Sequence, residues 1–145
     1  MAEIADNPPF DVAVVTPDGP VFSGEAHMLI VPGAAGEIGV LARHAPLVAT
    51  LKAGSTRVHL GGNEILEFAT GPGFFKVELD RALALVDDAV NVKEIDDSRA
   101  QAQLDAAKAE LEKVEAGDSA ADRWQLEQRI RHAENQLSVS GRTTG

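Results

Sequence analysis

The sequence predicts a β + α protein, in which a small N-terminal β-sandwich is followed by a C-terminal antiparallel two-helix hairpin. Three observations lead to this fold class. All seven prolines lie at or before Pro72 and ten of the 13 glycines precede Val90, so turn-forming residues are concentrated in the first part of the chain. In that part, short β-branched runs recur about every ten residues, as they do in sandwiches and barrels. Beyond Asp96 the apolar residues follow the 3.5-residue period of packed helices.

Eight strands are predicted in the β part, separated by residues that favour turns. The segments 17–20 and 61–63 are two of these turns, because proline fixes φ and glycine accepts a positive φ. Polar and apolar residues mix within several runs, which is typical of a sheet with one face in water. The predicted strands are 10–16, 21–23, 27–31, 47–52, 56–60, 64–69, 74–78 and 82–86. The side chains predicted to face the interior are Val58, Leu60, Leu66, Phe68, Phe75, Val77 and Leu85.

Two helices are predicted in the second part, each about 20 residues and 30 Å long. Apolar residues recur there at intervals of four and three, over 100–114 and again over 126–137. Asp96 or Asp97 is placed to cap the first helix, and Gly117 to end it. A tight connection then makes the helices antiparallel. The expected organisation is a sandwich over 1–93, a hairpin over 94–140 and a frayed tail over 141–145.

The apolar seam of the predicted hairpin is thin, since several of its inward positions are alanine. At about 25 cal/mol per Å² an alanine methyl group contributes little, and an isolated helix of this length is marginal in water. We therefore expect the hairpin to be weakly held. Two interpretations stay open: a hairpin that switches between docked and extended forms, and one that is always docked.

Composition excludes several classes of function. The formal net charge of −10 argues against nucleic acid as a partner, because phosphate neutralisation needs clustered lysine and arginine. The absence of cysteine excludes disulfides, thiolate metal sites and cysteine nucleophiles. No apolar run approaches the roughly 18 residues of a spanning helix, and the acidic N-terminus is unlike a signal or transit peptide. These features predict a soluble, cytosolic chain.

No motif indicates a self-contained enzyme, and no catalytic residue is predicted. The glycines at 33, 36 and 39 have neither the dinucleotide-binding nor the P-loop spacing. The acidic pairs at 87–88 and 96–97 are typical of solvated strand and helix ends rather than of acid–base dyads. The four histidines are scattered, with no helical pair beside a carboxylate, so no metal site is predicted.

Two longer blocks of sequence are more specific. Residues 31–47 are VPGAAGEIGVLARHAPL, and residues 15–26 are VTPDGPVFSGEA. Shorter matches follow at Gly71-Pro72-Gly73-Phe74, Asp87-Asp88-Ala89, Glu94-Ile95-Asp96 and Asn135-x-Leu137. Over residues 10–139 the chain closely resembles the epsilon subunit of bacterial F-type ATP synthases.

The resemblance implies a non-catalytic rotor subunit of the central stalk, with a ten-stranded β-sandwich before the helical hairpin. In that family the sandwich binds the foot of the gamma subunit and rests on the polar loops of the membrane-embedded c-ring. The match places Glu37 on the c-ring side with Arg43 and His44 close by, as the gamma and c-ring interface. The simpler interpretations are an exposed loop acid and a loop-packing histidine. Arg43 departs from the more usual family pattern Leu-Pro-Gly-His-Ala-Pro and adds a charge there.

A further motif, Ile95-Asp96-x-x-Arg99-Ala100, resembles the signature at which some bacterial epsilon subunits bind a regulatory ATP between the helices. The resemblance implies that Asp96 and Arg99 would contact this nucleotide, helped by Arg123 or Arg129 of the facing helix. Asp96 is also an ordinary helix cap. Ten acidic and seven basic residues give residues 96–145 a net charge of −3, which disfavours a polyanion. No other cofactor is expected.

An extended hairpin in this family would inhibit ATP hydrolysis by contacting the alpha/beta catalytic head. Three arginines of the second helix are balanced by three nearby acids, so we expect inhibition to be weak or absent. The expected location is peripheral, on the cytoplasmic side of the cell inner membrane. Two rival functions are a stand-alone β-sandwich adaptor and a carbohydrate- or nucleotide-processing enzyme, and the second lacks an acid–base pair and the aromatic residues of sugar sites.

Overall fold

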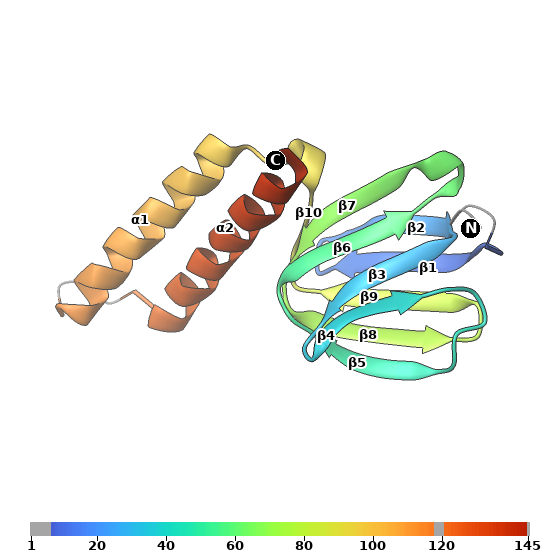
Figure 1. Cartoon of the computed structure of the whole chain (residues 1–145). Helices are drawn as coiled ribbons and strands as arrows, with labels where there is room; N and C mark the ends of the chain where they lie inside the picture. Colours follow the sequence, from blue (N-terminus) through green and yellow to red (C-terminus); the bar gives the residue numbers. More distant parts are fainter. Residues whose placement is uncertain (1–6, 118–120, 145) are drawn as a thin grey trace. The chain divides into compact units, whose positions relative to one another are not determined.

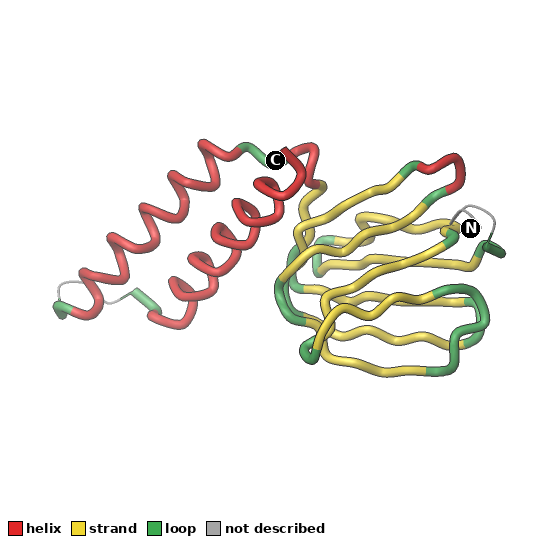
Figure 2. Tube along the Cα trace, viewed as in Figure 1, coloured by secondary structure: helices red, strands yellow, loops and turns green. Residues whose placement is uncertain are grey.

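The structure, a computed structural model, describes residues 7–117 and 121–144. The chain divides into two compact units, Met1–Asn91 and Val92–Gly145. Strands make up the first unit and helices the second (Figure 2). The division falls after Asn91, two residues before the boundary after residue 93 that the sequence pattern predicts.

The first unit contains ten strands and a short 3₁₀ helix. All eight strands predicted from the residues are present, with ends that shift by a few positions, and β4 and β10 are added to them. The elements are β1 (Phe10–Thr16), β2 (Gly19–Ala26), β3 (Met28–Gly33), β4 (Gly36–Val40), β5 (Leu47–Leu51), β6 (Gly54–His59), η2 (Gly61–Asn63), β7 (Ile65–Thr70), β8 (Gly73–Glu78), β9 (Arg81–Val86) and β10 (Ala89–Asn91).

The two added strands are defined by pairing rather than by composition. β4 carries two glycines in five residues, a composition that disfavours strands, yet it pairs with β3 from Leu29–Val40 to Gly33–Gly36. β10 has three residues, too few to show an alternating pattern, and it is held by its pairing with β7. Tertiary pairing therefore decides both elements.

The strands form one hydrogen-bonded sheet that folds back on itself as a sandwich (Figure 1). The order along the sheet is β10-β7-β6-β3-β5-β8-β9-β1-β2, and β4 also pairs with β3. β3 connects the two layers, because Met28–Ile30 pair with β6 whereas Gly33 pairs with β5. β1 runs parallel to β9 and antiparallel to β2.

Alternate side chains of both layers form the core of the sandwich, and most of the predicted interior residues belong to it. Leu60 and Leu66 are only partly buried and pack against this core. Leu85 is wrongly predicted: it is 46% exposed, because β9 turns Ala82, Ala84 and Val86 inward instead. The confirmed interior residues are Val58, Phe68, Phe75 and Val77.

The second unit is a helical hairpin, made of η3 (Val92–Glu94), α1 (Asp97–Glu115) and α2 (Arg123–Thr144). Of the two predicted caps, Asp96 is the one that caps α1: its Oδ1 accepts a hydrogen bond from the Arg99 N–H at 3.1 Å. Gly117, with a φ of 80°, follows the end of α1 as predicted. Asp122 caps α2, since its Oδ1 accepts from the Trp124 N–H at 2.9 Å.

Residues 141–144, for which the sequence pattern predicts a frayed tail, are helical in the structure, because α2 continues to Thr144. A glycine inside a helix costs about 1 kcal/mol relative to alanine, so Gly141 does not by itself end α2. Residue 145 and residues 118–120 of the connection lie outside the described residues.

The two helices pack along the predicted seam. Its fully buried members are Ala100, Leu104, Ala107, Leu126 and Ala133, and three of these five are alanine. Leu111, Val114, Ile130 and Leu137 are only partly buried. The hairpin therefore buries little apolar area per helix turn, which favours a low free energy of unfolding for this unit.

Candidate functional site

The tip of the β3–β4 hairpin is the first candidate surface, because Glu37 lies there. The turn consists of Ala34 and Ala35 between the paired residues Gly33 and Gly36. A Cβ on Gly33 would lie 2.6 Å from the Gly36 carbonyl oxygen, so the turn requires glycine at position 33. The Ala34 N–H donates to the carbonyl oxygen of Thr50 at 2.9 Å, which ties the tip to β5. A shallow hollow bordered by these small residues lies beside Glu37.

Glu37 itself forms an ion pair with Arg57 of β6. Arg57 Nη2 donates to Glu37 Oε2 at 2.8 Å, and the two side chains are 35% and 58% exposed. An exposed pair of this kind contributes on the order of 0–1 kcal/mol to stability. Its main effect is therefore geometric, because it fixes where the Glu37 carboxylate lies.

Arg43 and His44 form a second corner, in the connection between β4 and β5. Arg43 has a φ of 62°, and its N–H donates to Asp80 Oδ1 at 3.0 Å in the β8–β9 turn. His44 is half-buried, and its Nδ1 lies 2.7 Å from the Ala45 carbonyl oxygen. Asp80 also accepts the Asp11 N–H at its carbonyl oxygen, at 2.8 Å. The Asp80 carboxylate thus anchors this corner to the β8–β9 turn, and the Asp80 backbone holds that turn to β1.

The structure does not bring Glu37 close to Arg43 and His44, contrary to the expectation from the resemblance. Glu37 lies at the start of β4, whereas Arg43 and His44 follow its end. Three residues of extended chain alone separate Glu37 from Val40 by about 10 Å. The three predicted interface residues therefore belong to two surfaces, one at each end of β4.

A third surface, the apolar strip, lies on the outer face of β5, β8 and β9. We define it by Val48, Phe74 and Leu85, which are 72%, 63% and 46% exposed. In register, Phe74 lies opposite Leu85, and Leu85 lies opposite the partly buried Val15 of β1. Val48 lies opposite Lys76 and diagonally from Phe74 on the same face. Exposed apolar side chains that cluster on one face mark interaction surfaces.

Two adjacent aromatic residues in the sequence indicate the apolar strip. Phe74 and Phe75 are adjacent in β8, so only one of them can face the core. Phe75 is fully buried, as predicted, and Phe74 consequently faces water. Leu85 is missed because its apolar character was taken as evidence of burial.

The hairpin places its four predicted nucleotide contacts in two groups. Asp96 and Arg99 lie together at the start of α1. Arg123 lies beside the other end of α1, where its guanidinium contacts Glu115 and Glu127, each at 3.2 Å. Arg99 and Glu115 are separated by about 24 Å along the helix axis. A nucleotide at the Asp96–Arg99 end would therefore not reach Arg123, and Arg129 is exposed on α2.

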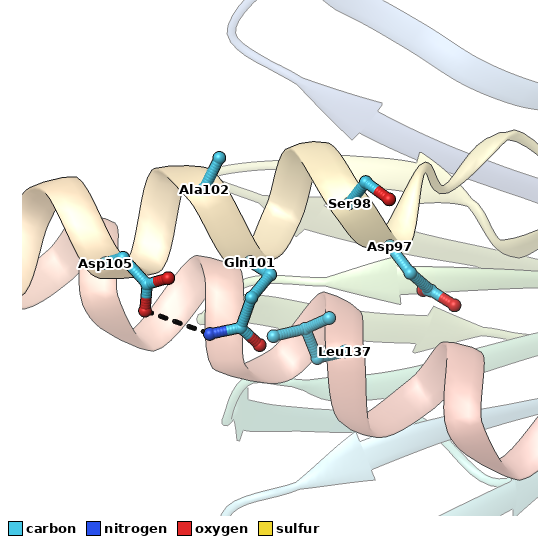
Figure 3. A pocket seen from close by; sticks show the side chains of 6 residues that line it. All are labelled: Asp97, Ser98, Gln101, Ala102, Asp105 and Leu137. Carbon is cyan, nitrogen blue, oxygen red and sulfur yellow. Dashed lines mark hydrogen bonds between the residues drawn. The ribbon is translucent and has the colours of Figure 1, made fainter.

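A hollow in the helical unit lies near the Asp96–Arg99 end, between α1 and Leu137 of α2 (Figure 3). Asp97 and Asp105 border it, and Gln101 Nε2 donates to Asp105 Oδ1 at 3.0 Å. Carboxylates repel phosphate groups, so this hollow is electrostatically unsuited to ATP. The prediction of a regulatory ATP gains no support from it.

Within residues 7–117 and 121–144, no group of three or more histidine, aspartate or glutamate side chains could hold a metal ion. No helix in that part of the chain is long and apolar enough to cross a membrane. His59 is the one histidine whose pKa is clearly shifted among these residues: burial lowers it, and the neighbouring Arg57 charge lowers it further.

Solved structures share this fold. A chain in the mitochondrial ATP synthase OSCP/F1/c-ring structure of Euglena gracilis superimposes with a TM-score of 0.72 at 22% identity, covering 92% of this chain and 82% of that one. A chain in the central stalk/c-ring structure of the Tetrahymena thermophila enzyme gives a TM-score of 0.55 at 12% identity. The fold is that of a sandwich-and-hairpin subunit of rotary ATP synthases.

Sequence comparison identifies the family. A family model for the β-sandwich domain of the ATP synthase delta/epsilon chain matches residues 9–92. The ATP synthase epsilon chain of Halalkalibacterium halodurans is 37% identical over 135 residues, 93% of this chain and 99% of that one. The epsilon chain of Laribacter hongkongensis is 41% identical over 104 residues, 71% and 74% of the two chains. The chain belongs to the ATP synthase epsilon-chain family and is a non-catalytic rotor subunit.

Proposed function

We propose that this rotor subunit links the gamma subunit to the c-ring through two separate surfaces of the β-sandwich, and so couples proton flow to ATP synthesis. The apolar strip binds the gamma subunit, and the β3–β4 tip with Glu37 meets the polar loops of the ring. The chain works by contact, and torque passes through a sandwich whose rigidity is its functional property. In this proposal the protein lies at the cytoplasmic face of the cell inner membrane, peripheral to it through the complex.

The observation that carries the proposal is the exposure of the apolar strip. Val48 and Phe74 keep 72% and 63% of their surface in water although they lie in the middle of a hydrogen-bonded sheet. Burial of such side chains against a partner stabilises a complex by about 25 cal/mol per Å². In the isolated subunit this apolar face stays in water, whereas a long-lived contact with gamma buries it.

The Arg43–His44 corner forms a separate polar contact in this proposal. Asp80 fixes the backbone of the corner, which leaves the Arg43 and His44 side chains directed at a neighbouring subunit. We assign the corner to the gamma-facing side, because it follows the end of β4, whereas Glu37 lies near the start of that strand.

The hairpin has a regulatory role at most in this proposal. Two carboxylates hold Arg123, and acidic residues border the hollow beside α1. This balance of charge predicts weak contact with the alpha/beta catalytic head and weak inhibition of ATP hydrolysis. Regulatory ATP at Asp96 and Arg99 would have to bind without Arg123.

The test is the affinity of the full-length chain for purified gamma subunit. Leu85→Asp places a charge on the apolar strip and is expected to weaken binding at least about tenfold, or 1.4 kcal/mol. Ile65→Asp on β7 is the matched control, since Ile65 and Leu85 are both 46% exposed. Equal affinities of the two variants for gamma, whether lowered or unchanged, would contradict the assignment of the strip.

A further inference from the structure

Arg57 has no role in the function proposed above, yet its position in the sandwich is closely determined. It lies on β6, opposite Ile30 of β3 and Glu67 of β7. Its Nε is inaccessible to water and has no hydrogen-bond partner among the described residues. A buried donor without a partner is unfavourable. The favourable contact of this side chain is therefore the one that its Nη2 makes.

The group that Arg57 contacts is the Glu37 carboxylate, which another element contributes. Nη2 reaches from β6 to Glu37 Oε2 on β4, and the bond of 2.8 Å has the length typical of a charge-assisted hydrogen bond. On the same face of the sheet, the Ser55 hydroxyl donates to Glu67 Oε2, which orients the neighbouring acid of β7 toward Ser55. Arg57 thus lies between an acid of its neighbouring strand and the Glu37 carboxylate, and its Nη2 bonds to Glu37.

The ion pair determines how Glu37 meets a partner. Oε2 is held by Arg57, whereas Oε1 makes no hydrogen bond to any residue within 7–117 and 121–144, and the side chain is 58% exposed. The shallow hollow beside Glu37 is bordered by glycine and alanine, so a partner loop can approach the carboxylate closely. The free oxygen of an oriented, half-neutralised carboxylate suits a hydrogen-bond donor.

We propose that Arg57 is a positioning residue for Glu37, which fixes the carboxylate so that the β3–β4 tip offers one oxygen to a hydrogen-bond donor in the polar loop of the ring. This inference rests on the proposed contact between Glu37 and the c-ring. It assigns Arg57 an effect on affinity and coupling, and almost none on the stability of the free subunit, because the pair is exposed.

The experiment is a double-mutant cycle in the assembled enzyme, measured as protons pumped per ATP hydrolysed in membrane vesicles. Glu37→Gln and Arg57→Gln are each expected to cause the same partial loss of this ratio, because each removes the same contact. The double variant is expected to be no worse than Glu37→Gln alone, because each substitution removes the same contact. Arg57→Lys keeps the charge and is expected to restore most of the coupling.

The controls separate positioning from a structural effect. Arg123→Gln breaks the exposed pairs Arg123–Glu115 and Arg123–Glu127, each at 3.2 Å, in the helical unit and is expected to leave coupling unchanged. All variants are expected to unfold within about 2 °C of the original chain.

Two results would overturn the inference in different ways. Full coupling in Glu37→Gln would remove both the proposed c-ring contact and the role of Arg57. If Glu37→Gln impairs coupling, the proposed c-ring contact stands. Normal coupling in Arg57→Gln, or losses that multiply in the double variant, would then refute only the positioning role of Arg57.

Discussion

The two units of this chain are stabilised in opposite ways. The sandwich is one hydrogen-bonded sheet closed over a core of large and β-branched side chains, several of which are completely inaccessible to water. The hairpin is held by a short seam in which three of the five fully buried members are alanine. In the proposed function, this difference suits the sandwich to transmit torque and limits the hairpin to a regulatory role.

The same comparison appears in the polar residues. In the sandwich, Asp80 and Arg57 connect segments that are far apart in the sequence. In the hairpin, Gln101–Asp105 and Arg123–Glu127 join residues one helix turn apart, and one exposed ion pair, Arg123–Glu115, joins α2 to α1 among the described residues. Such i,i+4 pairs contribute about 0.2–0.5 kcal/mol each and do little to fix one helix against the other.

The largest effect is expected in the sandwich core. Phe75→Ala removes a completely buried ring and should lower the free energy of unfolding by about 3–5 kcal/mol, with loss of the assembled rotor. Phe74→Ala is the control, because the adjacent ring is 63% exposed and its removal should cost under about 0.5 kcal/mol. Chemical denaturation measures both. A larger loss for Phe74→Ala than for Phe75→Ala would show that β8 has the opposite orientation.

The next effect concerns the close approach of β8 and β9. A Cβ on Gly73 would lie 1.9 Å from the Leu85 carbonyl oxygen, a backbone atom that cannot move without shifting β9. Gly73→Ala should therefore destabilise the sandwich by about 3 kcal/mol. Gly24→Ala is the control, since its Cβ would meet only the Phe22 ring at 3.6 Å. A Gly73→Ala protein that melts like the original chain would contradict this register.

A smaller effect is the pH dependence of sandwich stability through His59. Burial lowers the folded-state pKa of His59 below 6.5, and the Arg57 charge lowers it further, so below pH 6.5 the unfolded chain binds the proton more readily. Stability should be constant above pH 6.5 and fall below it, by at most about 1.4 kcal/mol per pH unit.

The variant His59→Gln should flatten this slope, whereas His44→Gln, at a half-buried position in the β4–β5 connection, should keep it. Urea denaturation between pH 5 and 8 gives the comparison. A slope that survives in His59→Gln would assign the pH dependence to another group.

The smallest effect is expected in the hairpin. Asp96→Ala removes the side-chain acceptor for the Arg99 N–H and should destabilise α1 by about 1 kcal/mol, without changing the unfolding of the sandwich. Asp97→Ala, one residue further and inside the helix, is the control. Hydrogen exchange of α1 amides distinguishes the two. Equal loss of protection in both variants would mean that the cap is not the stabilising feature.

The sequence predicted the elements better than it predicted their mutual arrangement. Periodicity sufficed for eight strands and two helices, because alternation and heptad spacing are local properties. β4 was not predicted, since its two glycines disfavour a strand and only pairing with β3 stabilises it. Leu85 was assigned to the wrong face, because hydrophobicity does not reveal which side of a sheet meets a partner.

The candidate site was predicted in part. The resemblance selected Glu37, Arg43 and His44, but their positions depend on the length and direction of β4, which the residues alone did not define. Arg57 and the apolar strip were not predicted, because their significance comes from neighbours across strands. The resemblance implies that Arg99 and Arg123 share a nucleotide, whereas the ion pair of Arg123 with Glu115 lies at the opposite end of α1 from Arg99.

The most direct test of the central claim compares two changes in the assembled enzyme: removal of all residues from Asp96 onward, and Leu85→Asp in the apolar strip. The measurement is ATP-driven proton pumping together with the rate of ATP hydrolysis. The account predicts that the truncated chain still couples pumping to hydrolysis, with little rise in hydrolysis, whereas Leu85→Asp loses coupling. Coupling that survives Leu85→Asp but fails on truncation, or a large rise in hydrolysis on truncation, would contradict it.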